Sequence, residues 1–160
     1  MTAAPPFSIR PTVPDDLEVL VDLEAEAFAS ASWGAEGMRT AFWTIGNKTL
    51  IAAGLGDVPQ GFAIWRNVAD EAEILTIGVV PPARRCGVAR LLLTRVIEEA
   101  RALGVESLFL EVRSQNEGAI GLYGTAGFET VGARRRYYKD GDDALIMQLN
   151  LTISGVDPSL

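Results

Sequence analysis

The sequence predicts an α/β fold, with a mixed, mostly antiparallel sheet, one parallel β-α-β crossover, and helices on both faces. Segments of alternating and of helical periodicity follow one another in the order β-α-α-β-β-β-α-β-α-β-β. Short turns join the three strands in the middle of the chain, which makes them antiparallel neighbours. A long amphipathic helix then separates the last of these strands from the next one, and such a crossover requires a parallel pair. We expect a single domain over residues 1–160, with its core at about 8–151.

The first part of the chain is expected to contain one strand and two helices. Ser8–Arg10 predicts a short extended segment that ends at proline residues. Asp15 with Glu18 is typical of a helix start, and apolar residues then recur at helical spacing as far as Phe28. A second helix is predicted over Ala35–Trp43.

The middle of the chain predicts three strands and one long helix. The strands are expected over Thr49–Ala53, Gly61–Arg66 and Glu73–Val80, as an antiparallel meander. Apolar residues then recur every three or four positions over Val88–Leu103, which indicates an amphipathic helix. Gly104 is suited to end that helix.

The last part of the chain predicts three further strands and a short helix. Ser107–Arg113 alternates between polar and apolar residues, as a half-buried strand does. Ala119–Thr125 is expected to be helical despite its glycines. Phe128–Tyr138 and Leu145–Leu151 are predicted to close the fold as a hairpin around Asp140-Gly141.

The composition excludes several kinds of chemistry. The chain has one cysteine and no histidine, which excludes an internal disulfide, the usual Cys/His zinc sites and catalytic pairs that need histidine. We therefore expect no metal, and any base must be Asp, Glu, Tyr or Lys, or a water held by one of them. A net charge of −7 argues against nucleic acid as a partner.

The hydropathy pattern predicts a cytoplasmic protein. No apolar run approaches the roughly 18 residues that a membrane-spanning helix needs. Met1–Pro6 also lacks the basic start and apolar stretch of an export signal. We therefore expect no membrane partner.

The loop between the strand 73–80 and the helix 88–103 has the features of an anion-binding turn. Gly87 and Ala89 are small enough to let a ligand approach the backbone closely. The first amides of the following helix have no acceptor within the helix, so they can bind a phosphate. Three arginines add positive charge: Arg84, Arg85 and Arg90. The diphosphate of a nucleotide-like cofactor fits this turn, and a tight β-α turn with surface arginines is the structural alternative.

The same turn carries a resemblance to a known family. Val79-x-Pro81-x-x-Arg84-x-x-Gly87-x-Ala89 resembles the acetyl-coenzyme-A loop of the Gcn5-related N-acetyltransferase (GNAT) superfamily. Leu110-Glu111-Val112-Arg113-x-x-Asn116 with Leu122-Tyr123-x-x-x-Gly127-Phe128, and then Tyr137-Tyr138-x-Asp140-Gly141, resemble the protein N-terminal acetyltransferases of that superfamily. The resemblance covers about residues 8–150, and it departs from the usual pattern at Ala89, where glycine is commoner, and at Arg84, where glutamine is common.

The resemblance implies a cofactor and a set of site residues. The cofactor is acetyl-CoA, which acts as a co-substrate. Glu111 is implied as the general base, and Tyr123 as the acid that protonates the departing thiolate. Trp33, Tyr137 and Tyr138 are implied as the lining of the acceptor groove. The implied cofactor-binding residues are Ile77, Gly78, Val79, Arg84, Arg85, Cys86, Gly87, Val88, Ala89, Arg90 and Asn116.

Structural interpretations of these residues remain open at this point. A strand-end carboxylate paired with Arg113 or with solvent would account for Glu111, and a core tyrosine beside Leu122 would account for Tyr123. Asn116 is a favoured residue for capping a helix as well as a candidate for cofactor contact. Exposed hairpin positions would account for the two later tyrosines, and core packing for the tryptophan.

The function implied by the resemblance is acetyl transfer to the N-terminal amine of a protein, with the N-terminal alanine of a ribosomal protein as the acceptor. An α-amine with a pKa of about 7.7–8.0 needs a weaker base than a lysine amine near 10.4, which suits a chain without histidine. Glu73 is a competing candidate for the base. The alternative functions are acetyl transfer to lysine, a polyamine or another small amine, and acyl-CoA binding without catalysis.

Overall fold

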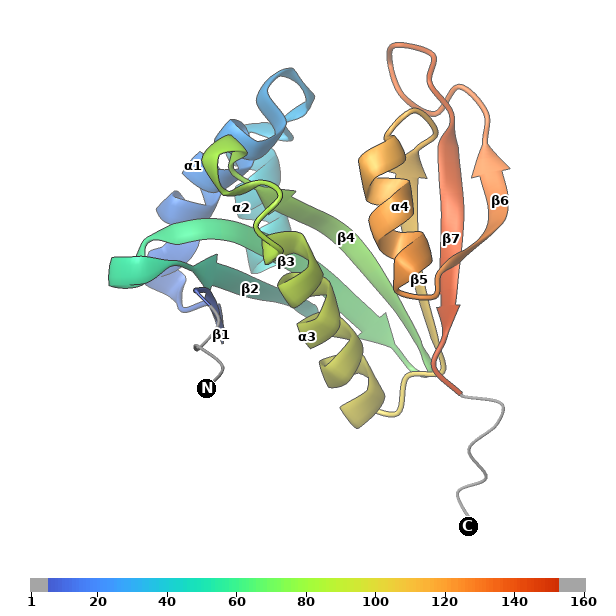
Figure 1. Ribbon diagram of the computed structural model, residues 1–160, viewed down its shortest axis with the longest axis horizontal. Coiled ribbons are helices and arrows are strands. Elements are labelled where there is room, and N and C mark those ends of the chain that lie inside the picture. The colour runs from blue at the N-terminus through green and yellow to red at the C-terminus, as the bar shows by residue number, and fades with distance from the viewer. Residues whose placement is uncertain (1–5, 153–160) are drawn as a thin grey trace. The chain divides into compact units, whose positions relative to one another are not determined.

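The computed structural model describes residues 6–152, and its strands follow the predicted order (Figure 1). The strand order in the sheet is β1-β2-β3-β4-β5-β7-β6. The mixed, mostly antiparallel sheet with one parallel pair is therefore confirmed. The chain clusters into two compact units, Met1–Arg66 with Leu75–Glu98 and Asn67–Ile74 with Glu99–Leu160. The single domain expected from the sequence stays a prediction.

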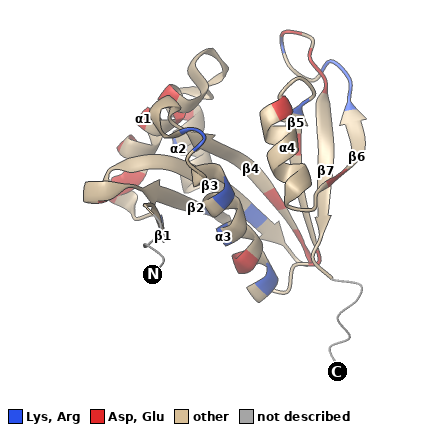
Figure 2. Cartoon of the chain, in the orientation of Figure 1, with Lys and Arg blue, Asp and Glu red and all other residues tan. Residues whose placement is uncertain are grey.

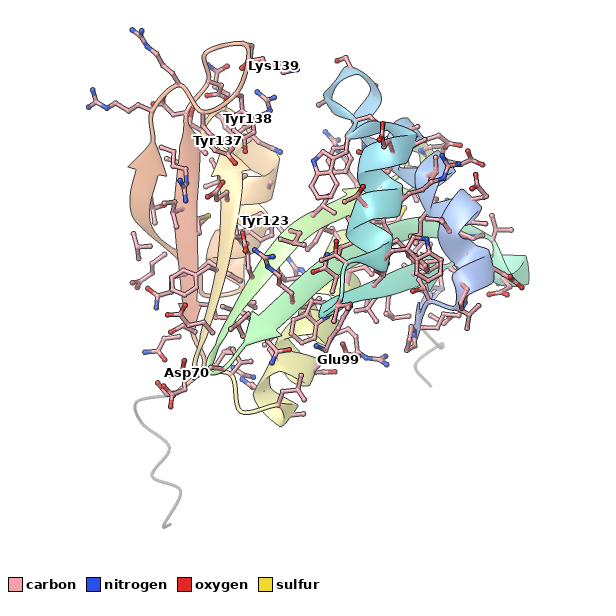
Figure 3. All side chains as sticks on the ribbon, turned by 180° about the vertical axis from the view of Figure 1, so that it is seen from behind. Asp70, Glu99, Tyr123, Tyr137, Tyr138 and Lys139 are labelled. Atoms are coloured by element: carbon pink, nitrogen blue, oxygen red, sulfur yellow. The ribbon has the colours of Figure 1, made fainter. Side chains whose placement is uncertain are left out.

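The first unit contains the N-terminal strands and helices. Its elements are β1 (Ser8–Pro11), α1 (Leu17–Phe28), α2 (Gly34–Trp43), β2 (Asn47–Ala53), most of β3 (Pro59–Val68), the end of β4 (Glu71–Val79) and most of α3 (Val88–Ala102). β2 pairs antiparallel with both β1 and β3. α1 and α2 cover one face of these strands and α3 covers the other (Figures 1 and 3). The core is formed by fully buried apolar side chains, among them Leu20, Met38, Ile51, Phe62, Trp65 and Leu92.

The start of α1 differs from the expected pairing of Asp15 with Glu18. Asp16 stabilises the start of the helix instead. Its carboxylate accepts a hydrogen bond from the amide of Val13 at 2.8 Å and forms an ion pair with Arg10 at 2.8 Å. The side-chain hydrogen bond from Arg10 holds the pKa of Asp16 below its usual value. Glu18 pairs with Arg39 of α2 at the surface.

The second unit is built around β5. Its elements are the start of β4, β5 (Ser107–Arg113), α4 (Glu117–Thr125), β6 (Glu129–Arg134) and β7 (Ala144–Asn150). Residues Glu71–Ile74 of β4 pair in parallel with Ser107–Leu110, which confirms the predicted crossover. β7 pairs antiparallel with β5 on one side and with β6 on the other. The buried side chains include Leu108, Leu110, Phe128 and Met147.

The closing hairpin has a longer loop than the sequence predicts. β6 ends at Arg134, so the prediction of a strand as far as Tyr138 is wrong. The chain turns at Arg136, which has a φ of 52° and whose amide donates to Asp143 Oδ1 at 2.9 Å. The Tyr138 amide then donates to the carbonyl of Asp142 at 3.2 Å, so the loop bonds to itself rather than extending the ladder. Tyr137 and Tyr138 therefore lie on this β6–β7 loop.

Two absences are established for residues 6–152. None of their helices combines the length and the apolar composition that crossing a bilayer requires. None of their His, Cys, Asp and Glu side chains gather in a group of three or more that could hold a metal ion.

Candidate active site

The last residues of the strand β4 lie in close contact with two phenylalanines. A Cβ at Gly78 would stand 2.5 Å from Cε1 of Phe62 and 3.0 Å from Cε2 of Phe28, so only glycine fits at this position. One residue past the end of β4, the Val80 amide donates to the carbonyl of Gln60 at 3.0 Å. The backbone that leads into the predicted cofactor turn is therefore fixed from two sides.

The turn itself ends in two residues with left-handed backbone. After the short 3₁₀ helix Pro81–Ala83, Arg85 has a φ of 62° and Gly87 a φ of 83°. Leu91 donates to the carbonyl of Gly87 at 3.1 Å, which makes Gly87 the residue that caps α3. The amides that follow it in the first turn of α3 have no acceptor within the helix, and they stand at the positive end of its dipole. The turn is thus suited to hold an anion, as the sequence predicts.

The arginines of this turn are in two different situations. Arg84 donates from Nε to the carbonyl of Val79 at 3.2 Å and from Nη2 to the carbonyl of Ala27 at 2.6 Å. Its guanidinium therefore has partners on β4 and α1. Arg85 and Arg90 are exposed. Cys86 carries a free, exposed thiol, 3.5 Å from the carbonyl of Arg84.

Trp33 and a buried carboxylate lie on the same unit. The Trp33 side chain is 47% exposed, so it is not a core residue, and its backbone amide donates to Glu24 of α1 at 2.6 Å. Glu24 is only 1% exposed, and its other oxygen accepts a hydrogen bond from the hydroxyl of Ser32. The sequence did not identify Glu24 as a site residue, because it lies within an acidic helix where most carboxylates face solvent.

Glu111 lies on β5 in the second unit, and an arginine holds its side chain. Oε1 of Glu111 accepts a hydrogen bond from Nε of Arg134 at 2.7 Å, and the Glu111 side chain is 25% exposed. The alternative that paired Glu111 with Arg113 is wrong, because Arg113 forms an ion pair with Asp140 at 2.9 Å. Glu111 is therefore oriented by β6, two strands away in the sheet.

Tyr123 of α4 is largely buried, and its ring packs edge-on against Phe128 with centroids 5.8 Å apart. Burial raises the pKa of Tyr123 to about 12. The phenol therefore keeps its proton throughout the neutral range, as a proton donor must. Figure 3 shows Tyr123 in the second unit and Tyr137 and Tyr138 on the β6–β7 loop.

The β6–β7 loop stacks its tyrosines on arginines. The guanidinium of Arg113 lies 3.9 Å from the ring centroid of Tyr138, and that of Arg134 lies 5.7 Å from the centroid of Tyr137. The two rings meet edge-on at 5.1 Å, and burial raises the pKa of Tyr138. The sequence reasoning missed both arginines as site residues. Arg113 and Arg134 are both in register with Ala144, a relationship that only the fold reveals.

Asn116 begins α4 as a cap. Its Oδ1 accepts a hydrogen bond from the amide of Ala119 at 3.1 Å, which confirms the capping interpretation. Its predicted cofactor contact stays a prediction. The first unit thus brings together the predicted residues of 77–79 and 84–90, and also holds Trp33, while the second unit holds Glu111, Asn116, Tyr123 and the tyrosine pair.

A strand that runs into a glycine-capped turn suited to an anion, followed by a crossover to a strand with a glutamate near its carboxyl end, is the arrangement that the resemblance implied. Residues 17–128 match the model of the Acetyltransferase (GNAT) family. The chain belongs to this family, and the resemblance stated from the sequence is confirmed.

Particular members of the family are similar to this chain over different lengths. An N-alpha-acetyltransferase RimI from Mycobacterium tuberculosis is 34% identical over 149 residues, which is 89% of this chain and 92% of that protein. A [ribosomal protein bS18]-alanine N-acetyltransferase from Escherichia coli strain K12 is 43% identical over 95 residues, which is 58% of this chain and 64% of that protein. That match thus spans just under two thirds of the relative's length.

A solved structure extends the likeness over nearly the whole fold. The crystal structure of the ribosomal-protein-S18-alanine N-acetyltransferase from Escherichia coli superposes with a TM-score of 0.84 at 33% identity. The superposition covers 94% of this chain and 97% of that chain.

Proposed function

We propose that this protein transfers the acetyl group of acetyl-CoA to the α-amine of a protein N-terminus, with the N-terminal alanine of a ribosomal protein as its acceptor. The observation that carries the proposal is the likeness, over 94% of the chain, to an enzyme named for that reaction. The relative named N-alpha-acetyltransferase, matched over 89% of the chain, supports the same amine class. We propose a cytoplasmic location as well, because ribosomal proteins are made there.

The cofactor turn supplies the affinity for acetyl-CoA in this proposal. Main-chain amides of Val88, Ala89 and Arg90 hold the diphosphate at the start of α3, and exposed Arg85 adds positive charge. Cys86 and Gly87 lie within the same turn and contribute backbone groups. The left-handed conformation of Gly87 supports this role, because it turns the chain so that successive amides of the turn can point to one side.

The last residues of β4 hold the rest of the cofactor. Ile77, Gly78 and Val79 lie beyond Ile74, the last residue of β4 in the parallel pairing, and their backbone groups pair with the amides of the pantetheine arm. The amide of Val79 polarises the carbonyl of the thioester, a type of contact that is worth about 2.7–4 kcal/mol in a dry site. The side chain of Asn116 adds a contact from the start of α4.

The reaction is a direct transfer. The α-amine attacks the thioester carbonyl, a C–N bond forms, and the C–S bond breaks to release coenzyme A. Glu111, acting through a water, takes the proton that the amine loses, and Tyr123 gives its proton to the departing sulfur. The raised pKa of Tyr123 supports its role, because the phenol is protonated before every turnover at neutral pH.

The acceptor peptide is held by aromatic side chains. Trp33 from the first unit and Tyr137 from the second are both about half exposed, at 47% and 53%, and are therefore available to a peptide. Tyr138 supports the loop through its contact with Arg113, and in this proposal it also contacts the peptide.

The proposal is tested by measuring thiol release from acetyl-CoA. The acceptor is a peptide that begins with alanine, offered with a free N-terminus and, as the control, with a blocked N-terminus and an internal lysine. We expect thiol release with the first peptide only. Release with the blocked peptide, or with a polyamine alone, would assign the protein to a different amine class.

A further inference from the structure

We propose that Arg84 is a positioning residue, which ties the cofactor turn to residues 29–34, the acceptor segment that carries Trp33. The inference rests on the proposed function and goes beyond it, because it assigns Arg84 to the acceptor rather than to the phosphates. The basic turn ahead of α3 lies beside the acidic helix α1 (Figure 2). All the contacts that carry the inference lie within the first unit.

Two nitrogens of the Arg84 guanidinium donate hydrogen bonds. Nε donates to the carbonyl of Val79, where β4 ends, at 3.2 Å. Nη2 donates to the carbonyl of Ala27, one residue before the end of α1, at 2.6 Å. Arg84 and Ala27 are far apart in the sequence, so this bond joins two separate parts of the unit. Because the guanidinium donates hydrogen bonds to two main-chain carbonyls, the protein fixes its orientation.

The end of α1 needs a cation from outside the helix. The last four carbonyls of a helix have no intrahelical partner, and the C-terminus carries the negative end of the dipole. α1 has no basic residue in its last turn, and Glu24 and Glu26 add negative charge there. Arg84 is placed to satisfy both requirements, since it supplies a positive charge and a donor to the Ala27 carbonyl.

The acceptor segment continues directly from this helix end. Ala29 has a φ of 47°, and its carbonyl accepts from the Ser32 amide at 3.1 Å. Glu24 then holds both the Ser32 hydroxyl and the Trp33 amide, and the Gly34 amide donates to the Ser32 hydroxyl at 2.9 Å. The backbone of Trp33 is therefore positioned by the last turns of α1, and Arg84 holds the carbonyl at that end.

This arrangement couples the two substrates. An anion that binds the amides after Gly87 makes the turn more rigid, and Arg84, which bonds to the Ala27 carbonyl, passes this restraint to the end of α1. The segment 29–34 then becomes more rigid, so a peptide binds it with a smaller loss of conformational entropy. By linkage, coenzyme A and peptide strengthen each other's binding by the same factor. We expect this factor to be about tenfold, within the usual range for such couplings.

The experiment compares Arg84→Met with Arg85→Met. Methionine keeps an unbranched stem and removes every donor, and both variants remove one positive charge from the same turn. Arg39→Met, which breaks only the surface pair with Glu18, is the control for loss of an ion pair. The readouts are the Kd for coenzyme A, the KM for an alanine-starting peptide, and amide hydrogen exchange of residues 29–34 with and without coenzyme A.

For Arg84→Met we expect the peptide KM to rise about tenfold while the Kd for coenzyme A changes less than threefold. We also expect the protection that coenzyme A confers on residues 29–34 in the wild type to be lost. For Arg85→Met we expect a weaker Kd for coenzyme A and an unchanged peptide KM. We also expect full protection of residues 29–34 at saturating coenzyme A. Arg84→Lys keeps one donor and the charge, and should recover part of the coupling. Arg39→Met should match the wild type.

A weaker Kd for coenzyme A in Arg84→Met, with an unchanged peptide KM and unchanged protection, would overturn the inference and assign Arg84 to the phosphates. If Arg84→Met does not fold, Arg84→Lys carries the same comparison. If wild type releases no thiol with any N-terminal peptide, the proposed function fails, and the exchange experiment still decides whether Arg84 couples the turn to the segment. Wild-type protein that shows no protection of 29–34 on adding coenzyme A contradicts the coupling alone.

Discussion

Nε of Arg134 lies 2.7 Å from Oε1 of Glu111, although β7 separates the strands on which the two residues stand. Arg134 is in register with Ala144 of β7, and Glu111 is in register with Ile146, two residues further along the same strand. The long arginine side chain therefore spans β7 to reach the carboxylate. Among the described residues, no hydrogen bond reaches Oε2 of Glu111, which leaves that oxygen for a water or an amine.

Glu111→Gln should lower kcat by a factor of about 100 or more while the affinity for acetyl-CoA stays within about threefold. Glutamine has the same shape and still accepts from Arg134, so the thermal midpoint should change little. Glu129→Gln on β6 is the matched control, because Glu129 is exposed and outside the site. Equal rates in the two variants would remove Glu111 from the mechanism and bring Glu73 forward as the base.

Tyr123→Phe should slow turnover by a similar factor, because the sulfur then leaves as an unprotonated thiolate. The ring contact with Phe128 is retained, so the fold should persist. Single-turnover kinetics with acetyl-CoA and peptide measure the effect. A variant that turns over at the wild-type rate would show that Tyr123 is only a core residue.

The raised pKa of Tyr123 also predicts how stability depends on alkaline pH. Between the ordinary value of 10.0 and about 12, the phenol ionises in the unfolded chain but not in the folded one, so stability falls as pH rises. This loss is about 1 kcal/mol near pH 11. Tyr123→Phe lacks the titrating group, so its free energy of unfolding should fall less between about pH 9 and pH 11. Denaturant titrations at the two pH values measure the difference.

Gly87→Ala should weaken acetyl-CoA binding by a factor of ten or more. A side chain at a φ of 83° is strained, and relief of that strain moves the amides that we propose to hold the diphosphate. Gly104→Ala is the matched control, because Gly104 has a φ of 79° at the other end of α3. Both variants should lose about 1–2 kcal/mol of stability, the cost of a side chain in left-handed backbone. Calorimetric titration with acetyl-CoA should show a lower affinity for Gly87→Ala than for Gly104→Ala. Equal affinities of the two variants would contradict the proposed placement of the diphosphate.

Gly78→Ala should destabilise the protein by about 1–3 kcal/mol, because the new methyl group would stand 2.5 Å from the ring of Phe62. Gly121→Ala in α4 is the opposite case, since a Cβ there meets nothing within 4 Å. Alanine favours a helix over glycine by about 1 kcal/mol, so Gly121→Ala should stabilise. Thermal unfolding of the two variants gives the comparison. A stabilising shift in Gly78→Ala would mean that packing at Gly78 is looser than described.

Periodicity predicted most of the fold because the strong patterns are local. The helix from Val88 and the strand Ser107–Arg113 begin where the sequence places them. The predicted strand through Tyr138 failed at Arg136, because nothing in a run of arginines and tyrosines signals a left-handed residue. The bonds that end the strand come from Asp142 and Asp143, which lie beyond the turn.

The site could be predicted only where its residues form a contiguous motif. The Gly87 turn was identified because the residues of a turn largely determine its backbone conformation. The contacts of Arg84 with Ala27 and of Arg134 with Glu111 were not predicted, because each depends on which elements the fold places side by side. An alternating pattern assigns a residue to a face but does not name its partner.

The central claim is that the acetyl group goes to an α-amine. The most direct measurement is tandem mass spectrometry of a peptide that begins with alanine and contains one internal lysine, after incubation with the protein and acetyl-CoA. We expect one added acetyl group, located on the first residue, and none when Glu111→Gln replaces the wild type under the same conditions. An acetyl group on the lysine, with the first residue unmodified, would contradict the account.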